Sequence, residues 1–299
     1  MPFLLGILEQ GLIISIAALG VYITYSILDF PDLSVDGTFS LGAAISIVLV
    51  LNNVNPFIAI LLSMIVGSLA GLATGLLHVK LKITNLLSGI LVMIGLYSIN
   101  LRVMGKANIS MFNKQSIFSD LNKFMAGSIW SKLVVILIIT LVIKFIMDLL
   151  FKTKFGFILK ATGDNETLVT TLGVNKGNIK ILALMFSNAL VGLSGGIMAQ
   201  YQGFSDISMG TGLIIMALAA IILGQSIFRK EGVIKATTIV IIGAFLYKLS
   251  IGIVLKLGVT PTDVKLITSI IVILAIVLNN VKFVDTIKGK KVKRGVIDA

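Results

Sequence analysis

The feature that most constrains this chain is a series of nine apolar runs, most of them close to the length that crosses a lipid bilayer, about 20 residues. They lie at about residues 11–28, 38–51, 56–79, 83–103, 129–150, 179–200, 213–228, 233–250 and 264–281. Because lipid offers no partner to free backbone groups, such runs form helices or closed barrels, and unbroken runs without period-two alternation favour helices. We therefore expect an all-α polytopic membrane protein with about 8–10 transmembrane helices and one short cytoplasmic helix.

Composition leaves little room for anything outside the membrane. Of 299 residues, 57% are hydrophobic and 13% are charged, against roughly 25% charged in soluble domains. We expect residues 1–282 to form a single transmembrane domain and residues 283–299 a basic cytoplasmic tail. The chain has no cysteine and one histidine, which excludes thiol catalysis, iron–sulfur clusters and the usual zinc sites. We expect no catalytic residue and no metal site.

The net charge of +12 has a membrane explanation. Basic residues cluster beside apolar runs, where they set topology and meet lipid headgroups, so we expect no nucleic-acid partner. One orientation places the loops at 80–82, 152–180 and 229–235, together with the tail from Lys282, in the cytoplasm and collects 16 of the 25 basic residues there. It predicts a cytoplasmic C-terminus. The side of the N-terminus stays open.

The segment from Asp29 to Thr38 separates the first two runs. It holds three of the thirteen acids, Asp29, Asp32 and Asp36, and it carries Pro31 and Gly37, which interrupt helices. Two interpretations remain open: a cytoplasmic hairpin with solvated acids, or a break inside the membrane, where irregular backbone lines a cavity or is buried in protein.

Two rows of glycines have the spacing of close helix packing. Gly67, Gly71 and Gly75 are four residues apart, and Gly192 and Gly196 repeat the interval. Small residues at this spacing let helix backbones touch. The rows predict a tight bundle within the chain or an interface between subunits.

The most informative stretch runs from Lys154 to Asn175. Asp164 is a good N-cap residue, Glu166 places a negative charge in a helix's first turn, and Gly173 suits the left-handed end. They predict a two-turn helix with Leu168 and Leu172 on one face and Glu166 with Thr170 on another. It is too short to be stable alone. It is either an interfacial cap or a lever that docks into a partner.

This element belongs to a longer recognisable order. Leu172-Gly173-Val174-Asn175 is followed by a long helix with Ser194-Gly195-Gly196, a Tyr201-Gln202-Gly203 loop and a short helix ending at Ala219–Gly224. From about residue 11 to 280 the chain resembles the permease subunits of branched-chain amino acid and ribose-type ATP-binding cassette importers. Residues 35–42, Val-Asp-Gly-Thr-Phe-Ser-Leu-Gly, are similar to the tryptophan/tyrosine-type branch.

The resemblance implies a permease that moves a small solute inward, an amino acid and in this branch an aromatic one. It implies a bacterial cell membrane location, two cytoplasmic ATP-binding subunits, an extracellular solute-binding lipoprotein and a second permease copy. ATP and Mg²⁺ would bind the ATPase. This chain binds no cofactor itself, because it contains no G-x-x-x-x-G-K-[ST] loop.

The resemblance also assigns roles to residues. The coupling helix, within the loop at about 152–178, would contact the ATPase through Gly163, Asp164, Asn165, Glu166, Thr167, Thr170 and Gly173. The translocation pathway would use Asp32, Ser34, Asp36 and Thr38, with Asn188 from the polar residues inside the spans. In many relatives the segment after the first helix carries an Asn-Phe-Ala-His-like sequence. This chain has Asp and Ser there instead, so the substrate role of that segment in the relatives is not transferred to this chain.

Two further sets of residues can each be explained either by a function or by a simpler structural role. Lys106, Lys114 and Lys123 lie in the expected external loop at 105–128, where they meet acids on a delivery protein or simply aid solubility. His78 stands beside Lys80 at an expected helix end, where a favourable dipole contact explains it better than catalysis.

Two other functions compete with the importer. An ion-coupled secondary carrier would use Asp29, Asp32 or Asp36 as its ion site; a protonophore would stop it and orthovanadate would spare it. A membrane scaffold would show no solute flux even with every partner present.

Overall fold

The computed structural model describes residues 2–112, 114–119, 129–228, 235–259, 263, 266–273 and 277. Its long helices are α1 (Pro2–Tyr22), α2 (Ser34–Leu51), α3 (Pro56–Val79), α4 (Asn85–Met104), α6 (Ser131–Leu150), α9 (Lys176–Gln202) and α11 (Ala236–Lys256). The shorter elements are the π-helical turn η1 (Ile23–Ile27), α7 (Lys154–Asp164), α8 (Glu166–Thr171), α10 (Leu213–Ile227) and the strands β1 (Asn108–Ser110) and β2 (Phe204–Asp206).

Seven helices in the described ranges are long and apolar enough to cross a membrane, which confirms the polytopic all-α class. The expected run at 213–228 differs, because α10 has only 15 residues. At 1.5 Å per residue it extends about 22 Å, less than the ~30 Å hydrocarbon core. The run expected at 264–281 lies largely outside the described residues, and so does the whole basic tail at 283–299.

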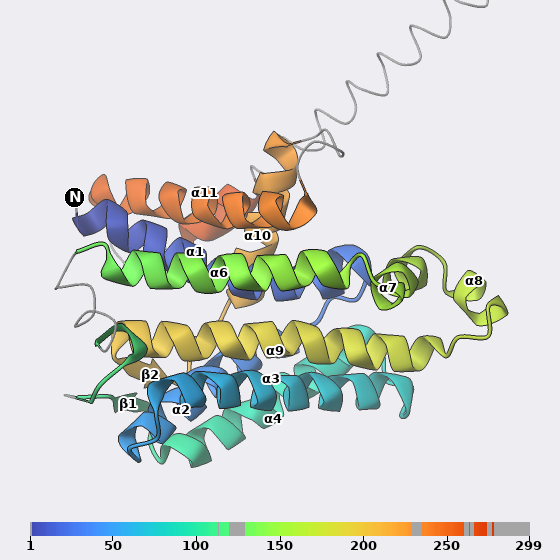
Figure 1. Ribbon diagram of the computed structural model, residues 1–299, viewed down its shortest axis with the longest axis horizontal. Coiled ribbons are helices and arrows are strands. Elements are labelled where there is room, and N and C mark those ends of the chain that lie inside the picture. The colour runs from blue at the N-terminus through green and yellow to red at the C-terminus, as the bar shows by residue number, and fades with distance from the viewer. Residues whose placement is uncertain are drawn as a thin grey trace, which may run out of the picture.

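The long helices lie side by side, with β1 and β2 at one end of the bundle and α7 and α8 at the other (Figure 1). We call these the strand end and the α8 end. The helix at the centre is α9, of which 78% of the apolar window is buried. It packs against α1, α2 and α3, while α10 and α11 pack on each other and on α1. A displacement of α9 would therefore also displace the three helices that pack against it.

The glycine rows of α3 and α9 face each other inside this one chain. A Cβ on Gly67 would lie 3.1 Å from the Cα of Gly192, and a Cβ on Gly196 would lie 2.9 Å from the Ser63 hydroxyl. At Gly71 a Cβ would overlap the Leu184 carbonyl. The two backbones therefore touch along several turns, which the small residues make possible.

The break between α1 and α2 is shorter than expected. Asp29 has φ 53°, in the left-handed region, and α2 begins at Ser34, four residues before the expected start at Thr38. The reason is Asp32, whose Oδ1 accepts the backbone N–H of Ser34 at 2.9 Å and so supplies a partner to the first turn. Gly37 consequently lies inside α2, where a Cβ would crowd Leu96 of α4 at 3.1 Å.

At the strand end, β1 and β2 form an antiparallel pair with Asn108 opposite Asp206. The Asp206 carboxylate accepts the Ser208 hydroxyl and backbone N–H, which lowers its pKa below the ordinary aspartate value. In the expected external loop, Lys114 Nζ donates to Asn53 Oδ1 at 2.6 Å. Lys123 lies outside the described residues.

Candidate functional site

The short helix α8 is built by its caps, but not by the cap residue that the sequence suggested. Asp164 is the last residue of α7, and the chain turns at Asn165, with φ −157° and ψ 98°. The Asn165 side chain accepts the N–H groups of Thr167 at 3.0 Å and Leu168 at 3.2 Å. The prediction of Asp164 as N-cap is therefore wrong by one residue, because its own backbone still continues α7.

The other end of α8 has the expected glycine. Gly173 has φ 75°, and its N–H donates to the Thr170 carbonyl at 3.0 Å. Before α8, Gly163 lies so close to the Ile27 carbonyl that a Cβ would overlap it. Helix α7 is thereby packed against η1, the turn that leads into the break before α2.

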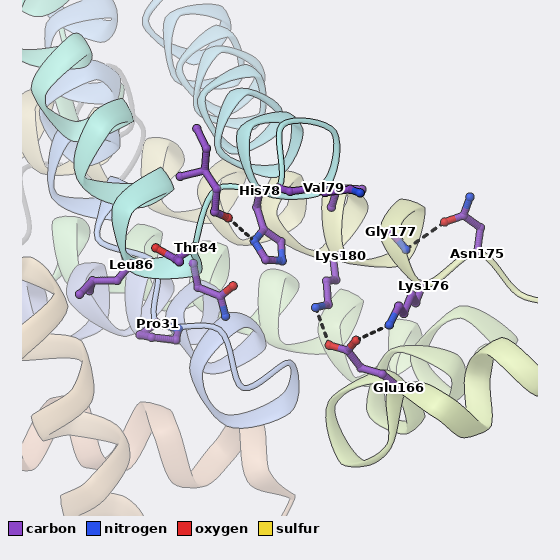
Figure 2. A pocket seen from close by; sticks show the side chains of 13 residues that line it. Pro31, His78, Val79, Thr84, Leu86, Glu166, Asn175, Lys176, Gly177 and Lys180 are labelled. Atoms are coloured by element: carbon purple, nitrogen blue, oxygen red, sulfur yellow. Dashed lines mark hydrogen bonds and ion pairs between the residues drawn. The ribbon is translucent and has the colours of Figure 1, made fainter.

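Glu166 ties α8 to the start of α9. Its carboxylate contacts Lys176 Nζ at 2.8 Å and Lys180 Nζ at 2.5 Å, as Figure 2 shows. Hydrogen bonds from these two ammonium groups hold the pKa of Glu166 below the ordinary glutamate value. Neither lysine is among the site residues predicted from the sequence, although their spacing of four residues places them on one face of a helix.

The opposite face of α8 is exposed in the part of the chain that the structure describes. Leu168 is 51% exposed and Leu172 is 64% exposed, whereas Val169 between them is buried. Asp164, Asn165, Thr167 and Thr170 are exposed around this pair. The element thus presents two leucines with a polar rim, while Val169 and Glu166 fix it to the rest of the chain.

A cavity of about 830 Å³ lies beside the Glu166 ion pairs. Figure 2 shows that its wall combines α8, the start of α9, the end of α3 and Pro31 from the break before α2. His78 closes one side: its Nδ1 lies 2.9 Å from the Ile83 carbonyl, and its ring packs edge-on against Phe30. The α8 end therefore brings the expected coupling element next to the expected pathway segment.

Four of the five expected pathway residues meet in one buried network. Asn188 Nδ2 donates to Asp32 Oδ2 at 2.8 Å, and Asn188 Oδ1 accepts the hydroxyls of Thr38 at 2.7 Å and Ser34 at 3.3 Å. All four residues are at most 2% exposed. The network joins the middle of α9 to the first turns of α2.

Asp36, the fifth, faces elsewhere. Its Oδ2 accepts the N–H of Gly212 at 2.8 Å and its Oδ1 that of Ile214 at 2.9 Å. Ser40 Oγ accepts the Gly210 N–H at 2.9 Å. A carboxylate at a helix N-terminus interacts favourably with the helix dipole, so α2 holds the start of the short helix α10. Asp29, in contrast, is exposed.

Within the ranges that the structure describes, no three His, Asp or Glu side chains lie close enough together to hold a metal ion. The buried acids instead accept hydrogen bonds from protein groups. The chemistry that the site offers is therefore hydrogen bonding and ion pairing, suited to positioning helices and polar solutes.

Comparisons with known proteins identify the family of this chain. The sequence matches a family model described as the permease component of a branched-chain amino acid transport system over residues 3–283. The tyrosine transport system permease protein of Clostridioides difficile (strain R20291) is 46% identical over 97% of this chain and 99% of its own length. The ribose import permease protein RbsC of Escherichia coli (strain K12) is 26% identical over 93% of this chain and 86% of its own. No solved structure matches this chain.

Proposed function

Because the chain belongs to the permease family of branched-chain amino acid transport systems, we propose that it is the membrane-spanning subunit of an ATP-driven importer for an amino acid. ATP binds and is hydrolysed in a separate cytoplasmic subunit, and this chain converts the motion of that subunit into opening and closing of a pathway.

The observation that carries the proposal is the exposed leucine pair formed by Leu168 of α8 and Leu172 at its C-cap. Leu168 and Leu172 project from an element that is itself fixed by Asn165, Val169 and Glu166. An apolar pair with a polar rim on an anchored helix is suited to insertion into a groove of a partner protein. We assign this surface to the ATPase, with Asp164, Asn165, Thr167 and Thr170 as its rim.

A continuous set of contacts leads inward from this surface. The ion pairs of Glu166 connect α8 to Lys176 and Lys180 of α9. Further along α9, Asn188 binds Asp32 and Thr38, and Gly192 touches α3. Displacement of α8 by closing ATPase subunits would therefore move α9, and with α9 the first turns of α2.

The remaining partners follow from topology and from the relatives. The α8 end carries the basic loop at 152–180, so we place it in the cytoplasm of a bacterial cell. The strand end then receives an extracellular solute-binding protein, and a second permease copy completes the pathway. The relative from Clostridioides difficile is a tyrosine transport system permease, which favours tyrosine or a similar aromatic amino acid as the solute.

The rival ion-coupled carrier has less support. Asp32 is engaged by Asn188 and by the Ser34 N–H, and Asp36 by the N–H groups of Gly212 and Ile214. Asp29, the third acid of that proposal, is exposed, and the family that the chain matches consists of permease components.

The test is uptake of labelled L-tyrosine by proteoliposomes that hold the permease with its ATPase and solute-binding protein. We expect uptake that requires ATP, stops with orthovanadate and persists with a protonophore. Uptake without nucleotide, or its loss with a protonophore alone, would overturn the proposal. Leu168→Asp with Leu172→Asp should abolish co-purification of the ATPase. Leu257→Asp, at a leucine that is 79% exposed beyond α11, serves as the control and should retain it.

A further inference from the structure

A second, smaller cavity of about 330 Å³ lies between α2, α4 and the segment that leads into α10. Its polar wall is formed by Asp36, Ser40, Asn100 and Thr211, and its apolar wall includes Tyr97 and Ile207. Building on the proposed importer function, we propose that this cavity binds the ammonium group of the transported amino acid.

The first observation is an acceptor without a donor. Asn100, on α4, is 1% exposed. Its Nδ2 donates to the Gly37 carbonyl at 3.2 Å, which fixes the orientation of the amide. Its Oδ1 has no hydrogen-bond partner among the described residues. A buried acceptor in a native protein is normally paired, so this oxygen is available to a donor on a bound molecule.

The second observation is Asp36. Each of its carboxylate oxygens accepts one backbone N–H, and a carboxylate oxygen has room for a further donor. Asp36 lies inside the span Ser34–Leu51 and is partly exposed toward the cavity. Ionisable groups within membrane spans face bundle interiors or aqueous cavities rather than lipid. The accessible side of Asp36 therefore meets water or a solute.

The side chains that line the cavity indicate which chemical group of the solute binds there. Among the described residues that line the cavity there is no lysine, arginine or histidine, whereas a carboxylate, an amide oxygen and the hydroxyls of Ser40, Ser98 and Thr211 do line it. A protonated primary amine has three donors and no acceptor, which matches such a wall. A carboxylate would meet no cation here. Met93, Ile94 and Tyr97 add an apolar face for the solute's side chain, and the volume lies within the usual range of small-molecule pockets.

Binding to the purified full-length permease in nanodiscs tests this. The probes are L-tyrosine, tyramine, which keeps the amine, and 3-(4-hydroxyphenyl)propionate, which lacks it. We expect the two amines to compete for one site and the desamino acid to bind at least tenfold more weakly. Equal binding of all three probes, or preference for ribose, would overturn the ammonium assignment.

Variants locate the site. Asn100→Ala should weaken tyramine binding at least tenfold, whereas Asn52→Ala, which removes an exposed amide at the end of α2, should leave it unchanged. Tyr97 is 56% exposed, so Tyr97→Ala tests the same cavity with little risk to folding and should weaken tyramine several-fold. Wild-type binding by both cavity variants would refute the proposal.

The outcome separates the two proposals. If the complete complex imports tyrosine with ATP but Asn100→Ala keeps a wild-type KM and wild-type tyramine affinity, the cavity assignment fails alone. If the complex shows no ATP-driven uptake while the permease still binds amines through Asn100, the importer function fails and the amine site stands.

Discussion

Asn188 in α9 and Asp32 in the break before α2 are joined by a buried hydrogen bond of 2.8 Å between Nδ2 and Oδ2. The same helix begins with Lys176 and Lys180, which hold Glu166 of α8. One rigid element thus carries both contacts, about 18 Å apart for the twelve residues from 176 to 188. The surface proposed to dock the ATPase and the residues proposed to line the pathway are connected through α9.

Replacing Asn188 tests that connection. Asn188→Leu leaves the Asp32 carboxylate and the hydroxyls of Ser34 and Thr38 without their amide partner. Buried polar groups that lose a partner cost about 1–3 kcal/mol each, so the melting temperature in detergent should fall by several degrees. Asn178→Leu, at an exposed position on the same helix, is the control and should change the free energy of unfolding by less than about 0.5 kcal/mol. An unchanged melting temperature for Asn188→Leu would count against the network.

The contact between α3 and α9 predicts an unusual response to a single methyl group. Gly71→Ala would place a Cβ against the Leu184 carbonyl, and overpacking of this kind costs about 1–3 kcal/mol. Gly95→Ala in α4 meets no atom within 4 Å and should be neutral or slightly stabilising, since alanine is the better helix former. Thermal unfolding of the two variants in one detergent decides the point. Equal stability would mean that α3 and α9 can separate without loss.

Much of the fold could be predicted because its signals are local. Hydropathy located the long helices. Glycine spacing predicted close helix packing, but it left open whether the contact lies within the chain, as it does at Gly71 and Gly192, or between subunits. The caps of α8 were harder, since Asp164 and Asn165 are both good N-caps and only the continuation of α7 decides between them.

The site depends on contacts that no local pattern contains. Asp32 and Asp36 are four residues apart, yet one binds Asn188 of α9 and the other caps α10 at Gly212. Both partners lie more than 150 residues away, so their choice is set by helix packing. Sequence reasoning placed these acids in one pathway segment, but it did not assign them different partners.

Reversing the charge at position 166 should affect coupling more than stability. Glu166→Lys would place three ammonium groups together with Lys176 and Lys180. The native ion pairs are partly exposed, and such pairs contribute at most about 1 kcal/mol, so the protein should still fold. ATP-driven uptake should fall about tenfold, because loss of the ion pairs and repulsion among the three ammonium groups together approach the ~1.4 kcal/mol that corresponds to a tenfold change. Glu166→Gln, which keeps an acceptor oxygen for one lysine, should retain more uptake. Wild-type uptake and ATPase association in Glu166→Lys would remove the proposed link between α8 and α9.

The same ion pairs predict a pH dependence with a defined sign. Because Lys176 and Lys180 lower the pKa of Glu166 in the folded protein, the unfolded chain binds the proton more tightly. The stabilisation is therefore fully present above the ordinary glutamate pKa of about 4.3. It is lost as the pH falls through the lower folded value. Wild type should exceed Glu166→Gln in free energy of unfolding by up to about 1 kcal/mol at pH 7, and the difference should vanish under strongly acidic conditions. Thermal unfolding of both proteins across this range measures it. A constant difference at every pH would show that the carboxylate charge contributes nothing to holding α8 on α9.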